Sequence, residues 1–563
     1  MLATLLISLF VTRTIVIPAQ FGDLPFACTH EQMQQTLSAA GAYFDRQIPD
    51  KAPFTFDLGP TVTLPENYAY YGRNTTDKRD EYLYRAVLEA CRQADSSVDF
   101  SQYDSDNDGA VDAVMILIPG PSEADGAGEL YVWPRKASLS DDGAGLILDG
   151  KRVDVYAVTN EEGHLGTLCH EFGHILGLPD LYDTDGKASG GLSPALRGST
   201  ALMDEGNRND GYRTPPALNA VERDFLQIGR CEEISPGNYT LEAVSDQGRY
   251  LRISGPDPDE YFLLECRAAR GDDAFIGGDG LLVYHIDRSS LHPRGQSDFF
   301  LRELNAAERW SFNQINCRPG QECARLVPAD SLAPGVAGAF FGRGVTDLGM
   351  GSQVPLRFYD GSVPPLALTG IGIQPDGSVS MTVIEPLHET VISPYQDAVL
   401  VRWTVPIAAD KLAGCELSWT DENGQEHSSQ RIQPSSDGRY AYVIERLRPG
   451  TSYKLTLRVL DLNQGCYTNE QVFTTKPFNE KLRPFIYLND VARYTDGIFP
   501  RGAALFLRVF NLPGASVSWY FNGERVSLEA DGTFLLTRDG ELKAVARLPD
   551  GSEEILVKKI TVQ

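Results

Sequence analysis

The pentad His-Glu-Phe-Gly-His, at residues 170–174, has residue types and a spacing that suit a catalytic zinc ion. On a helix, His170 and His174 lie one turn apart on one face, so that a nitrogen of each imidazole can reach a single Zn²⁺. Glu171 then lies beside the metal, where it can take a proton from the attacking water and donate it to the leaving amine. Such pentads also occur by chance, but this one predicts metal-assisted hydrolysis of a peptide bond, with Glu171 as general base and acid.

The residues after the pentad predict a third zinc ligand at Asp180. Gly177 suits a left-handed exit from the helix, and Pro179 prevents the helix from resuming. The chain can then carry Asp180 back beneath the histidines, and a carboxylate oxygen is a competent zinc ligand. Asp183 and Asp204 are the alternative ligands, and without a metal Asp180 would be an ordinary loop carboxylate.

A second cluster, Asp-Ser-Asp-Asn-Asp-Gly-Ala-Val-Asp at residues 104–112, follows the first part of a calcium-binding EF-hand loop. Acidic side chains stand at its first, third, fifth and ninth positions, and a glycine stands at the sixth. Met115 replaces the glutamate that closes such a loop, and the sequence indicates no flanking pair of helices. We expect a structural Ca²⁺ here, the alternative being a hydrated acidic turn, and the candidate ligands are Asp104, Asp106, Asp108 and Asp112.

The elements that must position these groups read as an α/β domain over residues 14–230. Residues 14–21 and 113–119 are apolar runs that predict buried strands. Apolar residues recur at helical spacing over residues 33–44, directly after a capping box. Two alternating runs around an Asp-Gly pair predict a hairpin over residues 146–160, and the pentad helix follows it.

The rest of the chain predicts three β-rich domains. Strand-like runs punctuated by Gly and Pro indicate a β-sandwich over residues 231–387. Residues 388–477 resemble a fibronectin type III domain, in the tryptophan of an early strand and the Leu-Arg-Pro-Gly-Thr-Ser-Tyr turn. Residues 478–563 resemble a further immunoglobulin-like module. The fold class is therefore multidomain, with an α/β catalytic domain followed by β-sandwich domains.

The stretch from His170 to Asp183 resembles the immune inhibitor A-type metallopeptidases, secreted bacterial enzymes of the metzincin clan. Residues 12–26, 104–120 and 201–229 resemble that family too, as do residues 280–290 and 325–331, so the likeness covers residues 14–385. It implies a metzincin-like catalytic domain that holds Zn²⁺ and cleaves a protein or peptide substrate. It also implies that Met203 is a hydrophobic floor beneath the metal rather than a ligand.

One departure from the clan concerns the residue that would polarise the substrate carbonyl. Metzincins with a tyrosine as a further ligand carry it two residues after the methionine, where this chain has Glu205. Tyr212 and Tyr182 are the candidates for that role.

Charge and cysteine content exclude several other classes of function. The 563 residues include 50 Lys and Arg against 77 Asp and Glu, a formal net charge of −27 that argues against nucleic acid as a partner. None of the nine cysteines forms a Cys-x-x-Cys pair, so the chain has neither a zinc-ribbon nor a thioredoxin-like motif. The apolar start, residues 1–13, predicts a signal-peptide remnant that is too short to span a bilayer.

These observations predict a secreted or cell-surface zinc endopeptidase, expected as a monomer, whose C-terminal modules bind host or cell-surface protein or glycan. One alternative is a cell-surface glycan- or protein-binding protein with a vestigial peptidase domain, although a purely structural metal site would not need Glu171. Another is a gluzincin-type peptidase, which needs a helical Glu-x-x-x-Asp. Near the candidate Glu222, Phe225 and Leu226 stand where that Asp would fall.

Overall fold

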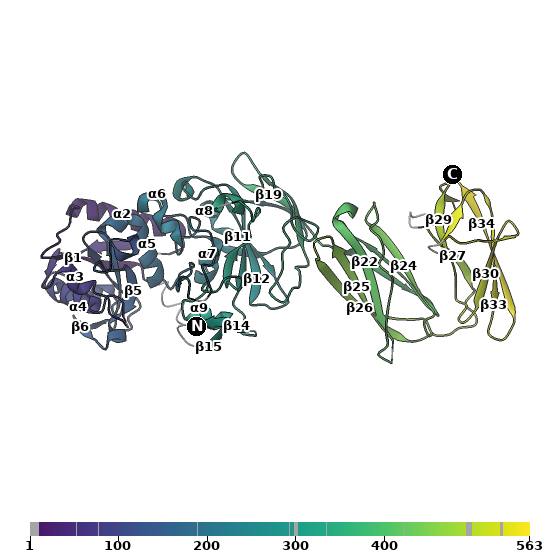
Figure 1. The fold of residues 1–563 in the computed structure, drawn as a ribbon, viewed down its shortest axis with the longest axis horizontal. Helices are drawn as coiled ribbons and strands as arrows, with labels where there is room; N and C mark the ends of the chain where they lie inside the picture. Colours follow the sequence, from purple (N-terminus) through teal and green to yellow (C-terminus); the bar gives the residue numbers. More distant parts are fainter. Residues whose placement is uncertain are drawn as a thin grey trace. The chain divides into compact units, whose positions relative to one another are not determined.

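A computed structural model describes residues 11–563 except 52, 77, 189, 292, 298–301, 334, 422, 491–497 and 530–532 (Figure 1). The predicted signal-peptide remnant therefore lies mostly outside the described residues. The chain divides into two units, residues 1–347 with 368–383 and residues 348–367 with 384–563. Among the described residues, none of the helices has both the length and the apolar character needed to cross a membrane.

A mixed sheet forms the centre of the N-terminal part of the first unit. Its strands are, in spatial order, β2 (Thr55–Leu58), β1 (Arg13–Phe21), β4 (Val114–Ile118), β8 (Val155–Asn160) and β5 (Arg135–Ser138), and β3 (Val62–Leu64) also pairs with β1. β2, β1, β4 and β8 run parallel, whereas β5 pairs antiparallel with β8. The two apolar runs predicted as buried strands are β1 and β4.

Both faces of this sheet are buried. Successive side chains of a strand point to opposite faces, so one strand contributes to two cores. In β1, Ile15 and Ile17 enter the core on one face, whereas Val16 enters the core on the other. Helices α2 (His30–Gln47) and α5 (His164–Ile175) contribute to the core that contains Val16. Helix α4 (Leu83–Ala94) contributes to the opposite core. The result is a helix–sheet–helix arrangement.

Two local predictions in this part are confirmed. The capping box at the start of α2 is present, with Thr29 accepting from the Gln32 amide and the Gln32 side chain accepting from the Thr29 amide. The Asp-Gly hairpin joins β6 (Leu146–Leu148) to β7 (Lys151–Val153) and is therefore shorter than predicted. Residues 155–160 leave it and form β8, which pairs parallel with β4. Asp149 and Gly150 both have positive φ, 48° and 76°, which the type I′ turn requires.

A second sheet of the first unit lies C-terminal to helix α7 (Ala220–Leu226). Its order is β16 (Ala324–Leu326), β13 (Gly280–Asp287), β12 (Glu260–Arg267), β11 (Arg249–Ser254) and β9 (Arg230–Glu233). In addition, β10 (Gly237–Leu241) pairs antiparallel with β19 (Val379–Ile384). The strand-like runs expected in residues 231–387 include β12, β13 and β19.

The second unit is made of β-sheets (Figure 1). One sheet contains β20 (His388–Pro394), β21 (Ala398–Thr404) and β24 (Arg439–Glu445). A second contains β23 (Glu426–Ser428), β22 (Leu412–Thr420), β25 (Ser452–Asp461) and β26 (Cys466–Thr474). Trp403 lies in the core between these two sheets. Two further sheets follow: β27 (Phe485–Asp490), β29 (Ala503–Phe510) and β32 (Phe534–Leu536); and β28 (Ile498–Phe499), β34 (Glu553–Val562), β33 (Gly540–Arg547), β30 (Ser516–Phe521) and β31 (Glu524–Arg525). The chain is thus multidomain with β-sandwich parts.

This division differs in one respect from the domain boundary expected at residue 388. Residues 348–367 belong to the second unit, and Met350 and Ala367 are buried in the core that contains Trp403. Burial of these apolar side chains, rather than position along the chain, decides where the segment belongs. The individual domain boundaries otherwise stay predictions.

Candidate metal centre

Helix α5 presents the pentad. His170 and His174 lie on one face of the helix, with ring centroids 4.8 Å apart. The helix ends as predicted, because Gly177 adopts a φ of +103° and the Leu178 amide donates back to the Gly173 carbonyl at 2.9 Å. The chain therefore turns sharply after the helix and brings Asp180 back to the two histidines.

Asp180 meets both imidazoles through a single oxygen. Its Oδ1 lies 3.2 Å from His170 Nε2 and 3.3 Å from His174 Nε2. All three side chains are largely buried, with side-chain exposures of 8%, 14% and 10% for His170, His174 and Asp180. Within the described residues, Asp180 Oδ1 has no hydrogen-bond partner. Three potential ligand atoms thus converge on one point.

The other ring nitrogens fix the direction of these atoms. His170 Nδ1 donates to the Leu202 carbonyl at 2.9 Å, and His174 Nδ1 donates to the Leu178 carbonyl at 2.8 Å. A carbonyl can only accept, so each Nδ1 carries a proton. In the neutral imidazole, Nε2 then presents its lone pair toward Asp180.

A bound cation fits the point where these lone pairs meet. Burial acts to lower the pKa of both imidazoles, but the Asp180 carboxylate outweighs it and raises the pKa of each. Burial alone would raise the pKa of Asp180, yet the two imidazoles hold it well below its usual range. Protonating both histidines would place two positive rings side by side in a buried site. One divalent ion satisfies all three atoms at once, so the donor set fits a zinc ion.

Asn313 holds Asp180 in place, and the sequence analysis missed it. Its Nδ2 donates to Asp180 Oδ2 at 2.8 Å, while its Oδ1 accepts from the Asp180 amide at 2.7 Å. The second carboxylate oxygen is therefore occupied, and Oδ1 alone faces the histidines. Asn313 is 133 residues from Asp180 in sequence and belongs to no motif. No local sequence signal could have identified it.

The alternative ligands are engaged elsewhere. The two oxygens of Asp183 accept from the Ser193 and Asp185 amides at 3.1 and 3.3 Å. Asp204 accepts from the Gly198 and Glu205 amides at 3.2 and 2.9 Å. Of the residues described, His170 and His174 share a potential metal cluster with Asp180 and not with either alternative.

Glu171 faces the same space as the cluster. It lines a cavity of about 940 Å³ that is also lined by His170, His174 and Asp180. Glu171 is buried, and its Oε2 has no hydrogen-bond partner within the described residues. Burial raises the pKa of Glu171 to about 8. A carboxyl group with a free oxygen beside the cluster can exchange a proton with a molecule in the cavity.

Met203 lies directly beneath helix α5. It is fully buried, and a Cβ added at Gly173 would come within 2.7 Å of its Sδ. The second variable position of the pentad therefore has to be a glycine if the methionine is to pack this closely. The Met203 amide donates to Glu222 Oε1 at 2.8 Å, which uses Glu222 as a support for this segment.

Tyr182 and Tyr212 both line the cavity. The Tyr212 hydroxyl donates to Asp125, and burial raises the pKa of Tyr212 to about 12. Tyr182 is next to Asp180, and burial together with that negative charge raises the pKa of its hydroxyl. Both phenols therefore stay protonated near neutral pH and can donate a hydrogen bond. The geometry does not favour one over the other, and the assignment of a helper tyrosine stays a prediction.

The acidic loop brings together three of its four candidate ligands. Oxygen atoms of Asp104, Asp106 and Asp108 lie within 4.8 Å of one another. Asp112 is turned to the Ser105 amide, from which it accepts at 3.1 Å. Lys151 lies 2.5 Å from Asp104 Oδ2, and its ammonium holds the pKa of Asp104 below the ordinary value. Calcium binding by this loop stays a prediction.

The N-terminal part of the chain is similar in sequence to a known family of peptidases. Residues 18–230 match the sequence model of the family described as "Immune inhibitor A peptidase M6, catalytic domain". The resemblance to the immune inhibitor A family is confirmed. The chain is 26% identical over 288 residues to Immune inhibitor A of Bacillus thuringiensis subsp. alesti, a match that covers 42% of this chain and 41% of that protein.

A second relative is a metalloprotease by name. The chain is 26% identical over 194 residues to the pre-pro-metalloprotease PrtV from two strains of Vibrio cholerae serotype O1, over 29% of this chain and 20% of that protein. The chain thus matches less than half the length of these relatives. Among solved structures, a two-domain fibronectin type III segment of chicken tenascin is 14% identical, covers 31% of this chain and 98% of its own, and has a TM-score of 0.14.

Proposed function

We propose that this protein is a secreted or cell-surface zinc-dependent endopeptidase. The observation that carries the proposal is the convergence of His170 Nε2, His174 Nε2 and Asp180 Oδ1 at 3.2–3.3 Å in a buried site. The family match over residues 18–230 and the similarity to Immune inhibitor A and to the pre-pro-metalloprotease PrtV support it. The substrate class is protein or peptide, by analogy with peptidases of that family.

His170, His174 and Asp180 would hold the zinc ion, and Glu171 would act as general base and acid. Bound at these atoms, zinc supplies an activated water and polarises the scissile carbonyl. Glu171 accepts the proton of the attacking water on its carboxylate and delivers it to the leaving nitrogen, so that the peptide bond is replaced by a carboxylate and an amine. Its free Oε2 and its place on the cavity wall support this role.

The same proposal includes a metzincin-like arrangement of the catalytic domain. Met203 packs against Gly173 under the pentad helix, where it shapes the floor of the site. The vestigial-domain alternative has no observation in its favour, whereas the convergence of three candidate ligand atoms beside Glu171 supports an active peptidase.

The decisive experiment compares Glu171→Gln with the parent protein. We expect Glu171→Gln to bind one zinc ion and to melt near the parent temperature, but to cleave casein about 10²–10⁴-fold more slowly, the range for general acid–base catalysis. Glu162→Gln, which alters an exposed carboxylate just before the same helix, is the matched control and should cleave normally. A chelator should abolish parent activity, and Zn²⁺ should restore it. Undiminished turnover by zinc-loaded Glu171→Gln, or a parent that binds no zinc, would refute the proposal.

A further inference from the structure

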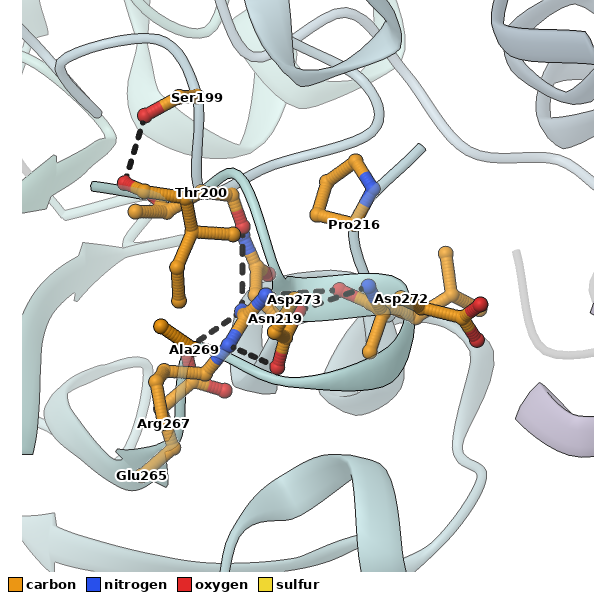
Figure 2. A network of polar contacts seen from close by, with 12 residues as sticks. Ser199, Thr200, Pro216, Asn219, Glu265, Arg267, Ala269, Asp272 and Asp273 are labelled. Carbon is orange, nitrogen blue, oxygen red and sulfur yellow. Dashed lines mark hydrogen bonds and ion pairs between the residues drawn. The ribbon is translucent and has the colours of Figure 1, made fainter. Parts of the chain in front are cut away.

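A buried charged cluster lies next to the segment that carries Met203 (Figure 2). Glu265 and Arg267 belong to β12, and Asp273 ends the short helix η6 (Gly271–Asp273). All three side chains are completely inaccessible to solvent. Arg267 Nη2 lies 2.5 Å from Asp273 Oδ1, and Arg267 Nη1 lies 3.1 Å from Glu265 Oε1.

Each N–H of the Arg267 guanidinium has an acceptor. Arg267 Nε also donates to Asp273, to Oδ2 at 2.9 Å. The two remaining N–H groups donate to backbone carbonyls. Nη1 donates to the Thr200 carbonyl at 3.1 Å, and Nη2 donates to the Ala217 carbonyl at 3.2 Å. A lysine has three donors on one nitrogen and cannot reproduce this planar set of five.

The two carboxylates hold the same backbone through its amides. Asp273 Oδ1 accepts from the Ala217 amide at 3.0 Å, and Glu265 Oε2 accepts from the Ala220 amide at 2.7 Å. The cluster therefore contacts residues 200–220, here termed the methionine segment, at both ends. Figure 2 shows the contact to Thr200 and the contacts around Asp273 on either side of Arg267.

The methionine segment in turn contacts one candidate ligand, His170, and the residue that follows another, Leu181 after Asp180. The Leu202 carbonyl accepts from His170 Nδ1 at 2.9 Å and so orients that imidazole. The Met203 carbonyl accepts from the Leu181 amide at 2.8 Å, immediately after Asp180. A displacement of residues 200–203 would therefore tilt His170 and move Asp180.

We infer that Arg267, with Asp273 and Glu265, is a positioning residue of the metal centre, and that the sheet after residue 230 is a constituent part of the catalytic site. The inference rests on the proposed function. Burying three charged groups is costly, and such a cluster is tolerated when every donor has a partner. Here the partners include the irregular backbone of the methionine segment, which has no regular secondary structure at Thr200 or Ala217 to hold it.

The test uses the full chain with Arg267→Lys, which keeps the charge, and Asp273→Asn, which keeps the volume. Glu260→Gln is the control, because Glu260 lies on the same strand, is also buried and pairs with His285 at 2.9 Å, away from the methionine segment. Zinc affinity is measured by chelator competition, and cobalt-substituted protein reports ligand geometry through its visible absorption bands. The melting temperature monitors folding separately.

We expect folded Arg267→Lys and Asp273→Asn to bind zinc about 10–100-fold more weakly, the range for groups that orient metal ligands, and to have altered cobalt bands. Glu260→Gln should keep the parent affinity and spectrum at whatever melting temperature it has. A folded Arg267→Lys with parent affinity and an unchanged cobalt spectrum would overturn the inference, as would an equal loss in Glu260→Gln. If the parent protein binds no zinc, the proposed function itself fails.

A second measurement on the parent protein covers the case in which the variants do not fold. Coupling between two sites is reciprocal, so zinc binding should stabilise the cluster if the cluster positions the ligands. Hydrogen exchange of the Ala217 and Ala220 amides should therefore slow when Zn²⁺ is added to the metal-free protein. Exchange at both amides that is unchanged by zinc would overturn the inference.

Discussion

The helix site around His170 and the acidic loop around Asp104 both gather potential metal ligands, but their ligand atoms have different surroundings. In the helix site, Asp180 Oδ1 and the two Nε2 atoms face one another in a buried pocket, while every neighbouring atom of the same groups is used by Asn313 or by a carbonyl. In the loop, Asp104 accepts from the Asp108 and Gly109 amides and pairs with Lys151.

This difference in hydrogen bonding determines how much each cluster would gain from a bound ion. A buried lone pair without a donor is costly, so the helix site gains most from a metal. The loop satisfies its first carboxylate with the protein's own donors, and Asp106 and Asp108 are exposed to water. We therefore expect tight binding at the helix site, and weaker binding at the loop in competition with Lys151.

The largest expected effect is the loss of zinc affinity when a ligand of the helix site is removed. Loss of a group that hydrogen-bonds to a metal ligand weakens metal binding about 10–100-fold. Asp180→Ala should weaken zinc binding by more than this, because it removes a ligand itself. Asp180→His should retain zinc, since imidazole is also a good zinc ligand. Metal content after dialysis measures both. Full zinc occupancy in Asp180→Ala would show that another group is the third ligand.

The next effect concerns the support of that ligand. Asn313→Ala should weaken zinc binding about 10–100-fold, because Asp180 would lose the donor that fixes Oδ2. Ser311→Ala is the control, since the Ser311 hydroxyl donates within its own helix, to the Ala307 carbonyl. Chelator competition gives both affinities. Equal affinities in the two variants would mean that Asn313 does not support the site.

A smaller effect is expected at the loop. Added Ca²⁺ should raise the melting temperature of the parent protein, since a ligand that binds only the folded state stabilises it by about 2.7 kcal/mol at 100 times its dissociation constant. Asp106→Ala should reduce this shift, because it removes one of the three clustered carboxylates. Identical calcium responses in parent and variant would exclude the loop as a calcium site.

The smallest effect sharpens the comparison by removing the competing ammonium. Lys151→Met should tighten calcium binding severalfold if Asp104 is a ligand, because Lys151 now pairs with its Oδ2. Lys454→Met, which removes a lysine paired with Glu470 in the second unit, should leave calcium binding unchanged. Calorimetric titration with Ca²⁺ measures both. Weaker calcium binding in Lys151→Met would contradict the idea of competition.

The sequence by itself determined what depends on neighbouring residues. Helical periodicity sets His170 and His174 on one face, and the Gly177 exit returns the chain to them. The capping box of α2 and the Asp149-Gly150 turn are equally local, because each is decided by residues at most three positions apart. Such features can be read without knowing where the rest of the chain lies.

Only the tertiary structure decided which distant groups complete the site. Asn313 reaches Asp180 across 133 residues, and Lys151 reaches Asp104 across 47. Arg267 reaches the Thr200 carbonyl across 67, a contact with a backbone atom that no side-chain pattern encodes. Contacts of this kind depend on how strands and loops pack together, and polar side chains such as these carry no periodic signal along the chain.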